Sequence, residues 1–308
     1  MRTGAVVTAA NITERDENIN AFDDIAVMSA PERIVATLKK CGIDDIIVVT
    51  GYDAKLRKKM RHFGLSFAEN KGYDVTDVLQ SAKLGLEKIY RRCDRVLFCP
   101  SGYPFFGDDT VRALVSSEGD AVIPSYGGKK GHPLLIDSEI VPRILTYEEE
   151  GGMSGAVKKS AKTITVVPVD DMGCVSSKSD EEEIKRLIDR QNPTLIRPQI
   201  EIGLAGMRNI MGTQMKQLLI QVDRLGSVRE ASESVGISYS AAWNLIKESE
   251  EELGSGLIDR QNGGRFGGTA RLTAEGRIIL DRYIKYEEEV SEFANAKFDE
   301  YFKGILGR

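Results

Sequence analysis

Hydroxyl, amide and basic side chains gather between residues 238 and 271 of the chain. An asparagine amide can form two hydrogen bonds with the edge of an adenine, serine and tyrosine hydroxyls can bind bases or phosphates, and arginine and lysine neutralise phosphates. This combination is the chemistry of DNA recognition. The residues predicted to contact DNA are Ser238, Tyr239, Ser240, Asn244, Lys247, Arg265 and Arg271.

Some polar residues of this segment also have a purely structural interpretation. Ser238 could serve only to cap a helix, and Trp243, the sole tryptophan, could pack in a core. We expect Trp243 to be buried or half-buried and Asn244 to face outward. The glutamates at 248 and 250–252 lie further along the same predicted helix, and we expect them to face solvent.

A helix, a tight turn and a second helix must position those side chains, and residues 225–276 contain them in that order. Ser227 can cap the first helix, because its hydroxyl accepts from free N–H groups of the first turn. Gly236 suits the sharp turn, and Ser238 can begin the second helix. The glycine-rich basic stretch 262–271 then predicts a hairpin wing, which completes a winged helix-turn-helix. Such a hairpin could also be merely exposed, but its arginines favour contact with phosphates.

The chain is acidic overall and basic around this hairpin. Its 308 residues carry a net charge of −5, which argues against a uniformly basic coat for nucleic acid. Between Asp259 and Lys285, however, six basic residues stand against three acidic ones. We therefore expect one basic face on an acidic molecule.

The first 190 residues alternate between strand and helix patterns. Short runs rich in valine and isoleucine are typical of buried parallel strands, and segments with apolar residues at helical spacing separate them. This alternation predicts an α/β fold with a doubly wound, mostly parallel sheet and any ligand at the C-terminal ends of the strands. Strands are expected at 4–10, 45–50, 65–69, 95–99, 121–124, 131–136 and 163–169, and helices at 31–41, 54–63, 76–90 and 176–189.

Composition argues against several classes of protein. The four cysteines lack Cys-x-x-Cys spacing and the chain has two histidines, so we expect no structural zinc site. The apolar run at the N-terminus soon becomes polar, which predicts neither a secretory signal nor a membrane span. We therefore expect a cytoplasmic protein.

Several blocks within residues 4–188 follow the residue order of a known enzyme family. They are VVTGYDAKL, NKGYDVTDVLQSAKLGL, DRVLFCPSGYPFFGDDTVRAL, IPSYGGKKGHPLLI, EEEGGMSGAV and VVPVDDMG. Through them the chain resembles the MobA-like NTP transferases, the nucleotidyltransferases that act on the molybdenum cofactor. The resemblance implies a nucleoside triphosphate over the edge of the sheet, a glycine-rich loop for its phosphates, and Mg²⁺ held by acidic residues.

The departures from this family fall on its chemistry. Asn11 and Glu17 stand where the first loop of the family has glycines, although Arg15 keeps its place. The aspartate that holds the metal corresponds to Gly102, and the second acidic segment aligns with 177–180, where carboxylates are displaced or absent. Phosphoryl transfer requires the metal and well-positioned phosphates. We therefore expect a catalytically impaired domain, with no catalytic and no metal-binding residues.

Acidic residues elsewhere could offer replacement ligands for a metal. Asp108, Asp109, Asp170 and Asp171 are the candidates. Carboxylates in such positions more often cap helices or face solvent from loops. We favour that structural interpretation.

A ligand pocket is still expected where the family's pattern is kept. The residues predicted to line it, for a nucleotide-like ligand, are Arg15, Gly51, Tyr52, Asn70, Tyr73, Asp77 and His132. Gly51 could instead form the turn after a strand, and Tyr73 and His132 could be satisfied buried residues. No cofactor is assigned, and the candidate effector is a nucleotide or a molecule related to the molybdenum cofactor.

The C-terminal third carries a second resemblance, from Arg197 onward. Its residues are Gly226-Ser227, Gly236-Ile237-Ser238-Tyr239, Ala242-Trp243, the stretch 263–268, and Leu272-Thr273 with Gly276. In this order they resemble the DNA-binding domain of the molybdate-responsive ModE regulators and, more distantly, the LysR-type winged helix. The resemblance implies double-stranded DNA as a partner.

The last predicted helix, 273–303, has more apolar residues than one helix can bury alone. We expect it to pair with a second copy, which would place two recognition helices roughly 34 Å apart on a near-palindromic site. The predicted organisation is a nucleotidyltransferase-like domain at 1–190, a linker at 191–198, and a winged helix-turn-helix and dimerisation domain at 199–308.

The function predicted from these features is that of a dimeric transcriptional regulator linked to molybdenum or molybdenum cofactor metabolism, with the impaired N-terminal domain as its sensor. The alternative is an active nucleotidyltransferase on a molybdopterin-type acceptor, with a DNA-binding domain that regulates its own gene.

Overall fold

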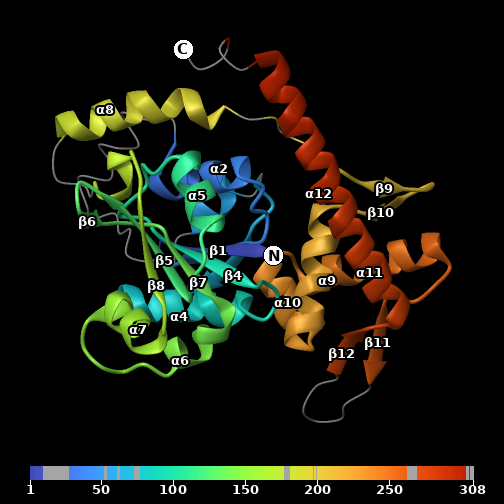
Figure 1. The fold of residues 1–308 in the computed structure, drawn as a ribbon. Helices are drawn as coiled ribbons and strands as arrows, with labels where there is room; N and C mark the ends of the chain where they lie inside the picture. The colour runs from blue at the N-terminus through green and yellow to red at the C-terminus, as the bar shows by residue number, and fades with distance from the viewer. Residues whose placement is uncertain are drawn as a thin grey trace. The chain divides into compact units, whose positions relative to one another are not determined.

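The computed structural model describes residues 1–9, 28–51, 54–60, 63–72, 77–176, 181–196, 198, 200–261, 269–302 and 305. The chain divides into two compact units (Figure 1). The α/β unit consists of Met1–Phe63, Ala68–Arg197 and Phe302–Arg308, and the helical unit consists of Gly64–Phe67 and Pro198–Tyr301. Four residues predicted to bind DNA or to line the pocket lie outside the described residues: Arg15, Tyr52, Tyr73 and Arg265.

An eight-stranded sheet forms the centre of the α/β unit (Figure 1). Its order is β3 (Ser66–Glu69), β2 (Ile46–Thr50), β1 (Thr3–Thr8), β4 (Arg95–Pro100), β7 (Leu134–Asp137), β5 (Ala121–Tyr126) and β6 (Lys129–Lys130), with β8 (Ile164–Pro168) paired to β5. Strand β1 is parallel to β2 and β4, β8 is parallel to β5, and β7 is antiparallel to both β4 and β5. Strands β1, β2, β4, β5 and β8 therefore share one direction, and the prediction of a mostly parallel α/β sheet is confirmed.

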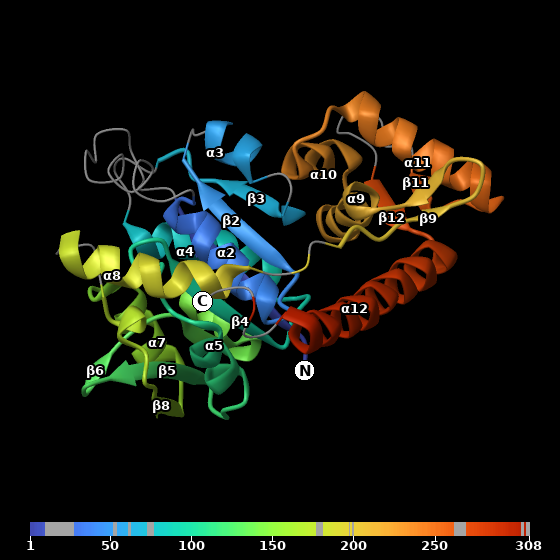
Figure 2. The ribbon, with the colours of Figure 1, turned by 90° about the horizontal axis from the view of Figure 1, so that it is seen from above.

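Helices cover both faces of this sheet. The helices on one face are α4 (Val78–Ile89), α6 (Val141–Leu145) and α7 (Gly152–Ser160), and those on the other are α2 (Ala30–Lys40), α5 (Asp108–Val115) and α8 (Glu181–Gln191) (Figure 1). Seen from above, α2 and α8 lie in front of the strands (Figure 2). The remaining described α-helix of this unit is α3 (Ala54–Lys59). Because both faces are covered, β2 is buried along its whole length, which explains its uninterrupted apolar run.

Local signals in the sequence start two of these helices. Ser29 and Glu32 form a capping box at the start of α2, in which the Ser29 N–H donates to the Glu32 carboxylate at 2.8 Å, and Pro31 lies in the first turn. Asp77 caps α4, because its carboxylate accepts from the N–H of Gln80 at 3.0 Å.

The helical unit is a winged helix-turn-helix. Its elements are hairpin strands β9 (Leu204–Ala205) and β10 (Asn209–Met211), helices α9 (Thr213–Leu225), α10 (Val228–Val235) and α11 (Tyr239–Leu253), wing strands β11 (Ile258–Gln261) and β12 (Thr269–Leu272), and the long helix α12 (Ala274–Phe302). The predicted caps are confirmed, since Ser227 accepts from Glu230 N–H and Ser238 accepts from Ala241 N–H. Gly236 forms the turn with φ of +76°, in the left-handed region that favours glycine.

Each of the three helices before the wing ends at a glycine in the left-handed conformation. These glycines are Gly226, Gly236 and Gly254, with φ of +67°, +76° and +68°. Such a residue closes a helix by letting the chain turn away without a clash of Cβ. The lengths of α9, α10 and α11 are thus set by residues adjacent to each helix.

One hydrophobic core holds the helical unit together. Leu218 of α9, Ala231 of α10, Ile246 of α11 and Leu280 of α12 all belong to it. Near the start of α12, the Tyr283 hydroxyl also donates to the carbonyl oxygen of Ile202 at 2.6 Å. Beyond this anchored part, α12 extends away from the other helices of the unit (Figures 1 and 2).

The segment predicted as a linker, 191–198, begins as folded structure. Gln191 is the last residue of α8, and its amide donates to the carbonyl oxygens of Pro104 and Phe106 at 3.0 and 3.3 Å. Residues Asn192–Leu195 continue as a short 3-10 helix. Gln191 is buried, and its amide satisfies these two carbonyl groups. The polar residues around it in the sequence do not reveal this role.

None of the helices in the described part of the chain has the length and apolar character that crossing a membrane would need.

Candidate functional site

Helix α11 presents a polar face at its N-terminal half. Ser238, Tyr239, Ser240, Asn244 and Lys247 are all exposed. The last three lie four and three residues apart, which places them on one side of the helix. The structure thus brings Ser240, Asn244 and Lys247 together on one side of α11, whereas Ser238 is the N-cap and the Tyr239 ring contacts Trp243.

The opposite side of α11 anchors the helix to its unit. Ala242 and Ile246 are fully buried, and Trp243 is half-buried against the core, as predicted. The Trp243 ring meets Tyr239 edge-on at a centroid distance of 6.1 Å, and the guanidinium of Arg229, from α10, lies 4.9 Å from the centre of the Tyr239 ring. Aromatic contacts therefore fix the N-terminal turn of α11.

The expectation that all the glutamates of α11 face solvent is wrong for Glu250 and Glu252. Glu250 accepts from the backbone N–H groups of Leu257 and Ile258, at 2.8 and 3.1 Å, and Glu252 accepts from Met207 N–H at 2.9 Å. Backbone donors at the start of the wing and at the β9–β10 turn need acceptors, and these two carboxylates supply them. The glutamates therefore hold the hairpins beside α11.

Lys247 lies next to an acidic residue of the same helix. Its ammonium group lies 3.6 Å from the Glu251 carboxylate, which also binds the guanidinium of Arg208 at 2.7 Å. In the wing, Arg271 is exposed on β12 opposite Asp259 of β11. Arg271 alternates with buried Ala270 and Leu272, so the pleat turns it outward.

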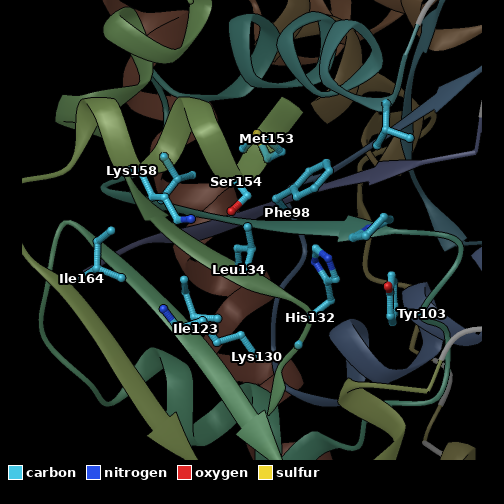
Figure 3. A pocket seen from close by; sticks show the side chains of 14 residues that line it. Phe98, Tyr103, Ile123, Lys130, His132, Leu134, Met153, Ser154, Lys158 and Ile164 are labelled. Carbon is cyan, nitrogen blue, oxygen red and sulfur yellow. The ribbon is translucent and has the colours of Figure 1, made fainter. Parts of the chain in front are cut away.

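A cavity of about 450 Å³ lies between α7 and the sheet in the α/β unit (Figure 3). Most of its lining is apolar, with lysines among the lining residues. It is lined by Val78, Phe98, Pro100, Tyr103, Ile123, Lys130, Gly131, His132, Leu134, Met153, Ser154, Val157, Lys158 and Ile164. Figure 3 shows His132 and Tyr103 side by side on one side of the view and Lys158 and Ile164 on the other. The walls suit a planar ring, and the exposed lysines Lys130 and Lys158 suit an anionic substituent.

Among the described residues that line this pocket, His132 is the one with a buried side-chain nitrogen that lacks a hydrogen-bond partner. Its Nδ1 is buried with no hydrogen-bond partner there. Burial lowers the pKa of the imidazole to about 4, so the ring is neutral at pH 7. Its backbone N–H donates to the carbonyl oxygen of Cys174 at 2.7 Å, and its ring lies 4.6 Å from that of Tyr103. A neutral imidazole held in this way can offer a ligand a hydrogen bond.

The other described residues of the predicted pocket have structural contacts. Gly51 is buried directly after β2. Asn70 is buried, its amide donates to the Ser81 hydroxyl at 3.0 Å, and its oxygen accepts from Gly72 N–H at 3.1 Å. Asp77 caps α4. Among the described residues that were predicted to line a pocket, His132 is the one that lines the cavity of Figure 3.

Sequence reasoning missed most of the residues around this cavity. Tyr103, Lys130, and the pair Ser154 and Lys158 of α7 come from three separate segments of the chain. One signal was present, since the lysines at 129 and 130 directly precede the Gly131-His132-Pro133 segment. A basic pair next to a retained motif could have placed a cation at the pocket.

The described residues do not fit the Mg²⁺ site of the nucleotidyltransferases. Gly102 has no side chain to offer a ligand, and Asp108 forms an ion pair with Lys40 at 3.1 Å. Asp171 accepts from the N–H of Gly107, the hydroxyl of Thr110 and the N–H of Gly173, at 2.8, 2.6 and 3.0 Å. In the described ranges no three carboxylate, histidine or cysteine groups cluster as metal ligands would. Residues Asn11, Glu17 and 177–180 lie outside those ranges.

We expect Asp171→Asn to lower the free energy of unfolding by about 2 kcal/mol, because an amide nitrogen would face N–H donors that the carboxylate now satisfies. Urea unfolding followed by circular dichroism measures this. The matched control is Asp170→Asn, since Asp170 is exposed. Added Mg²⁺ should leave the stability of the wild type and of Asp171→Asn unchanged. If Mg²⁺ instead stabilises the wild type and this gain is lost in Asp171→Asn, Asp171 is a metal ligand.

Comparison with protein families agrees with both parts of the chain. Residues 22–164 match the MobA-like NTP transferase domain, and residues 214–277 match the bacterial regulatory helix-turn-helix protein, lysR family. Both predicted resemblances are confirmed. The helix-turn-helix match supports DNA binding by the helical unit.

Curated relatives match the C-terminal part. The chain is 31% identical over 86 residues to the molybdenum-pterin-binding protein MopB of Rhodobacter capsulatus, covering 28% of this chain and 32% of MopB. It is 35% identical over 66 residues to the DNA-binding transcriptional dual regulator ModE of Escherichia coli K12, covering 21% of this chain and 25% of ModE. The chain thus spans a third or less of the length of these relatives.

Among solved structures, a nucleotidyl transferase from Methanothermobacter superposes with a TM-score of 0.49 and 17% sequence identity, over 62% of this chain and 99% of that one.

Proposed function

We propose that this protein is a cytoplasmic, DNA-binding transcriptional regulator of molybdenum metabolism, in which the α/β unit senses a small molecule. The observation that carries the proposal is the exposed polar face of α11, capped at Ser238 and anchored by Ile246 as a recognition helix must be. The similarity of this part of the chain to ModE supports the link to molybdenum.

The cavity beside α7 is the proposed effector site. Its apolar walls, its aromatic pair His132 and Tyr103, and the lysines Lys130 and Lys158 match a planar anionic ligand. A nucleotide and a molecule related to the molybdenum cofactor both have this chemistry. Such a ligand regulates DNA binding only if the DNA-bound and free forms of the protein differ in their affinity for it.

Helix α12 is the proposed dimerisation element. It is 29 residues long, and Ile278, Tyr286, Phe293 and Tyr301 are exposed on it, Phe293 to 65%. Large exposed apolar side chains of this kind mark interaction surfaces. Pairing of two copies through α12 would present two recognition helices to a near-palindromic operator.

DNA binding is tested with the region upstream of the protein's own gene, at stated salt concentrations. We expect Asn244→Ala to weaken specific binding about tenfold, because a two-hydrogen-bond contact with an adenine is lost. Electrophoretic mobility shift or fluorescence anisotropy measures this. The control is Asn209→Ala, another exposed asparagine of the helical unit. Equal affinity of both variants would remove Asn244 from the interface, and no specific binding by the wild type would overturn the proposal.

The alternative, an active nucleotidyltransferase, is tested separately. Incubation with CTP or GTP, Mg²⁺ and molybdopterin should release no pyrophosphate above background, because Gly102 provides no carboxylate for the metal. A Cβ at Gly102 would meet nothing within 4 Å, so Gly102→Asp is a suitable variant for restoring the carboxylate that the family has at this position. Sustained pyrophosphate release by the wild-type chain would establish the enzyme instead.

A further inference from the structure

The first two turns of the recognition helix contain no cation. Residues 239–246 read YSAAWNLI, and the first basic residue of α11 is Lys247. Lys247 has Glu251 only 3.6 Å away, so part of its charge is already compensated. A helix that enters a groove lined by phosphates needs positive charge near its N-terminal half. In this chain that charge must come from outside α11.

Arg229 of α10 meets this requirement. It is exposed, and its guanidinium lies over the ring of Tyr239, 4.9 Å from the ring centre. The Tyr239 ring in turn meets Trp243, which packs against the core of the unit. Arg229 is thereby tied to the beginning of α11, although it belongs to the preceding helix.

The contact with the ring leaves Arg229 exposed. A guanidinium held beside a ring can still donate its N–H groups to a phosphate in a two-pronged manner. Among the described residues no carboxylate lies within ion-pair distance of Arg229, although Glu230 and Glu233 are exposed on the same helix. Holding the side chain in place before DNA arrives reduces the entropy lost on binding.

We propose that Arg229 binds a DNA phosphate and that Tyr239 is the residue that positions it. This inference rests on the proposed function, because it assumes that α11 contacts DNA. It assigns a DNA contact to α10, which lies outside the residues that the sequence predicted to contact DNA. Tyr239 then acts mainly through its ring rather than through its hydroxyl.

The decisive experiment measures DNA affinity of the full chain as a function of salt concentration. With Arg229→Gln, we expect about tenfold weaker binding at low salt and a slope of log K against log salt that is smaller by about 0.9, the amount that one phosphate contact contributes. Arg229→Lys keeps the charge and should restore most of the slope. The control is Arg186→Gln on α8, an arginine exposed to 79% with no proposed contact to DNA.

The role of Tyr239 is tested by a double-mutant cycle. Tyr239→Phe keeps the ring and should leave the effect of Arg229→Gln unchanged, whereas Tyr239→Ala should reduce that effect, because the arginine is then no longer held. A purely structural role for Arg229 would alter stability without altering the salt slope. If the wild type binds DNA and Arg229→Gln has the wild-type slope and affinity, the inference is wrong and the proposed function stands. If the wild type does not bind DNA, both are wrong.

Discussion

Gly276→Ala should destabilise the helical unit by about 3 kcal/mol and abolish DNA binding with it. Gly276 is buried at the start of α12, where a Cβ would overlap the carbonyl oxygen of Leu257 and lie 3.0 Å from its carbonyl carbon. A backbone atom cannot rotate away as a side chain can, so α12 and the strand β11 would have to separate. The N–H of Gly276 also donates to the Thr273 hydroxyl at 2.9 Å, and the shift would disturb this cap.

Fluorescence of Trp243 measures this effect selectively, because Trp243 is the sole tryptophan of the chain and lies in the helical unit. The urea midpoint for Gly276→Ala should fall well below that of the wild type. The matched control is Gly212→Ala, since Gly212 has extended backbone with φ of −161° and a Cβ there would meet nothing closer than 3.6 Å. Equal midpoints for the two variants would show that the start of α12 can relax.

His132 should make the stability of the α/β unit depend on pH between about 6.5 and 4. Burial lowers the pKa of the folded-state imidazole from 6.5 to about 4. As pH falls through this window the unfolded chain gains a proton that the folded chain does not, so the free energy of unfolding falls. The stabilisation is complete above the unfolded-state pKa, and up to about 3 kcal/mol is lost by pH 4. Below pH 4 both states are protonated and the loss stops.

The measurement is urea unfolding by circular dichroism from pH 7 to pH 4, for the wild type and for His132→Gln. The stability difference between the two proteins should change with pH in the predicted direction, because the contributions of the carboxylates cancel in the comparison. The control is His62→Gln, which removes the chain's other histidine and measures how much that residue contributes to the pH dependence of stability. A difference that stays constant over the whole range would mean that His132 titrates normally in the folded protein.

The sequence predicted those elements of the fold whose signals are local. Ser227, Gly236 and Ser238 mark helix ends through hydrogen bonds to their own neighbours, and the structure has each of them in that role. Buried strands such as β2 are also visible as apolar runs. The predicted helix 273–303 corresponds to α12, Ala274–Phe302.

The missed elements depend on distant contacts. Helix α6 has only five residues. Helix α7 begins at Gly152, directly after Gly151, and glycine disfavours a helix. Helix α7 therefore depends on the packing of Met153 and Ala156 in the core. The β9–β10 hairpin is held by the carboxylates of Glu251 and Glu252 on α11. Neither dependence can be read from residues adjacent to the element.

The candidate sites differ in the same way. The face of α11 was predictable because helical spacing alone places Ser240, Asn244 and Lys247 together. The cavity of the α/β unit was not, because the topology of the fold brings Tyr103, His132 and Lys158 to one cavity from separate segments of the chain. Asn70 has a buried bond to Ser81 that a retained family motif does not distinguish from a ligand contact.

The three left-handed glycines that end α9, α10 and α11 make the lengths of these helices a local property of the sequence. Because Gly226, Gly236 and Gly254 terminate their helices through local backbone geometry, helix length in this unit does not rely on what is fused upstream. A gene fusion that places a different domain before α9 would leave these three helix ends unchanged. Helices α9, α10 and α11 would then keep their lengths in the fused protein.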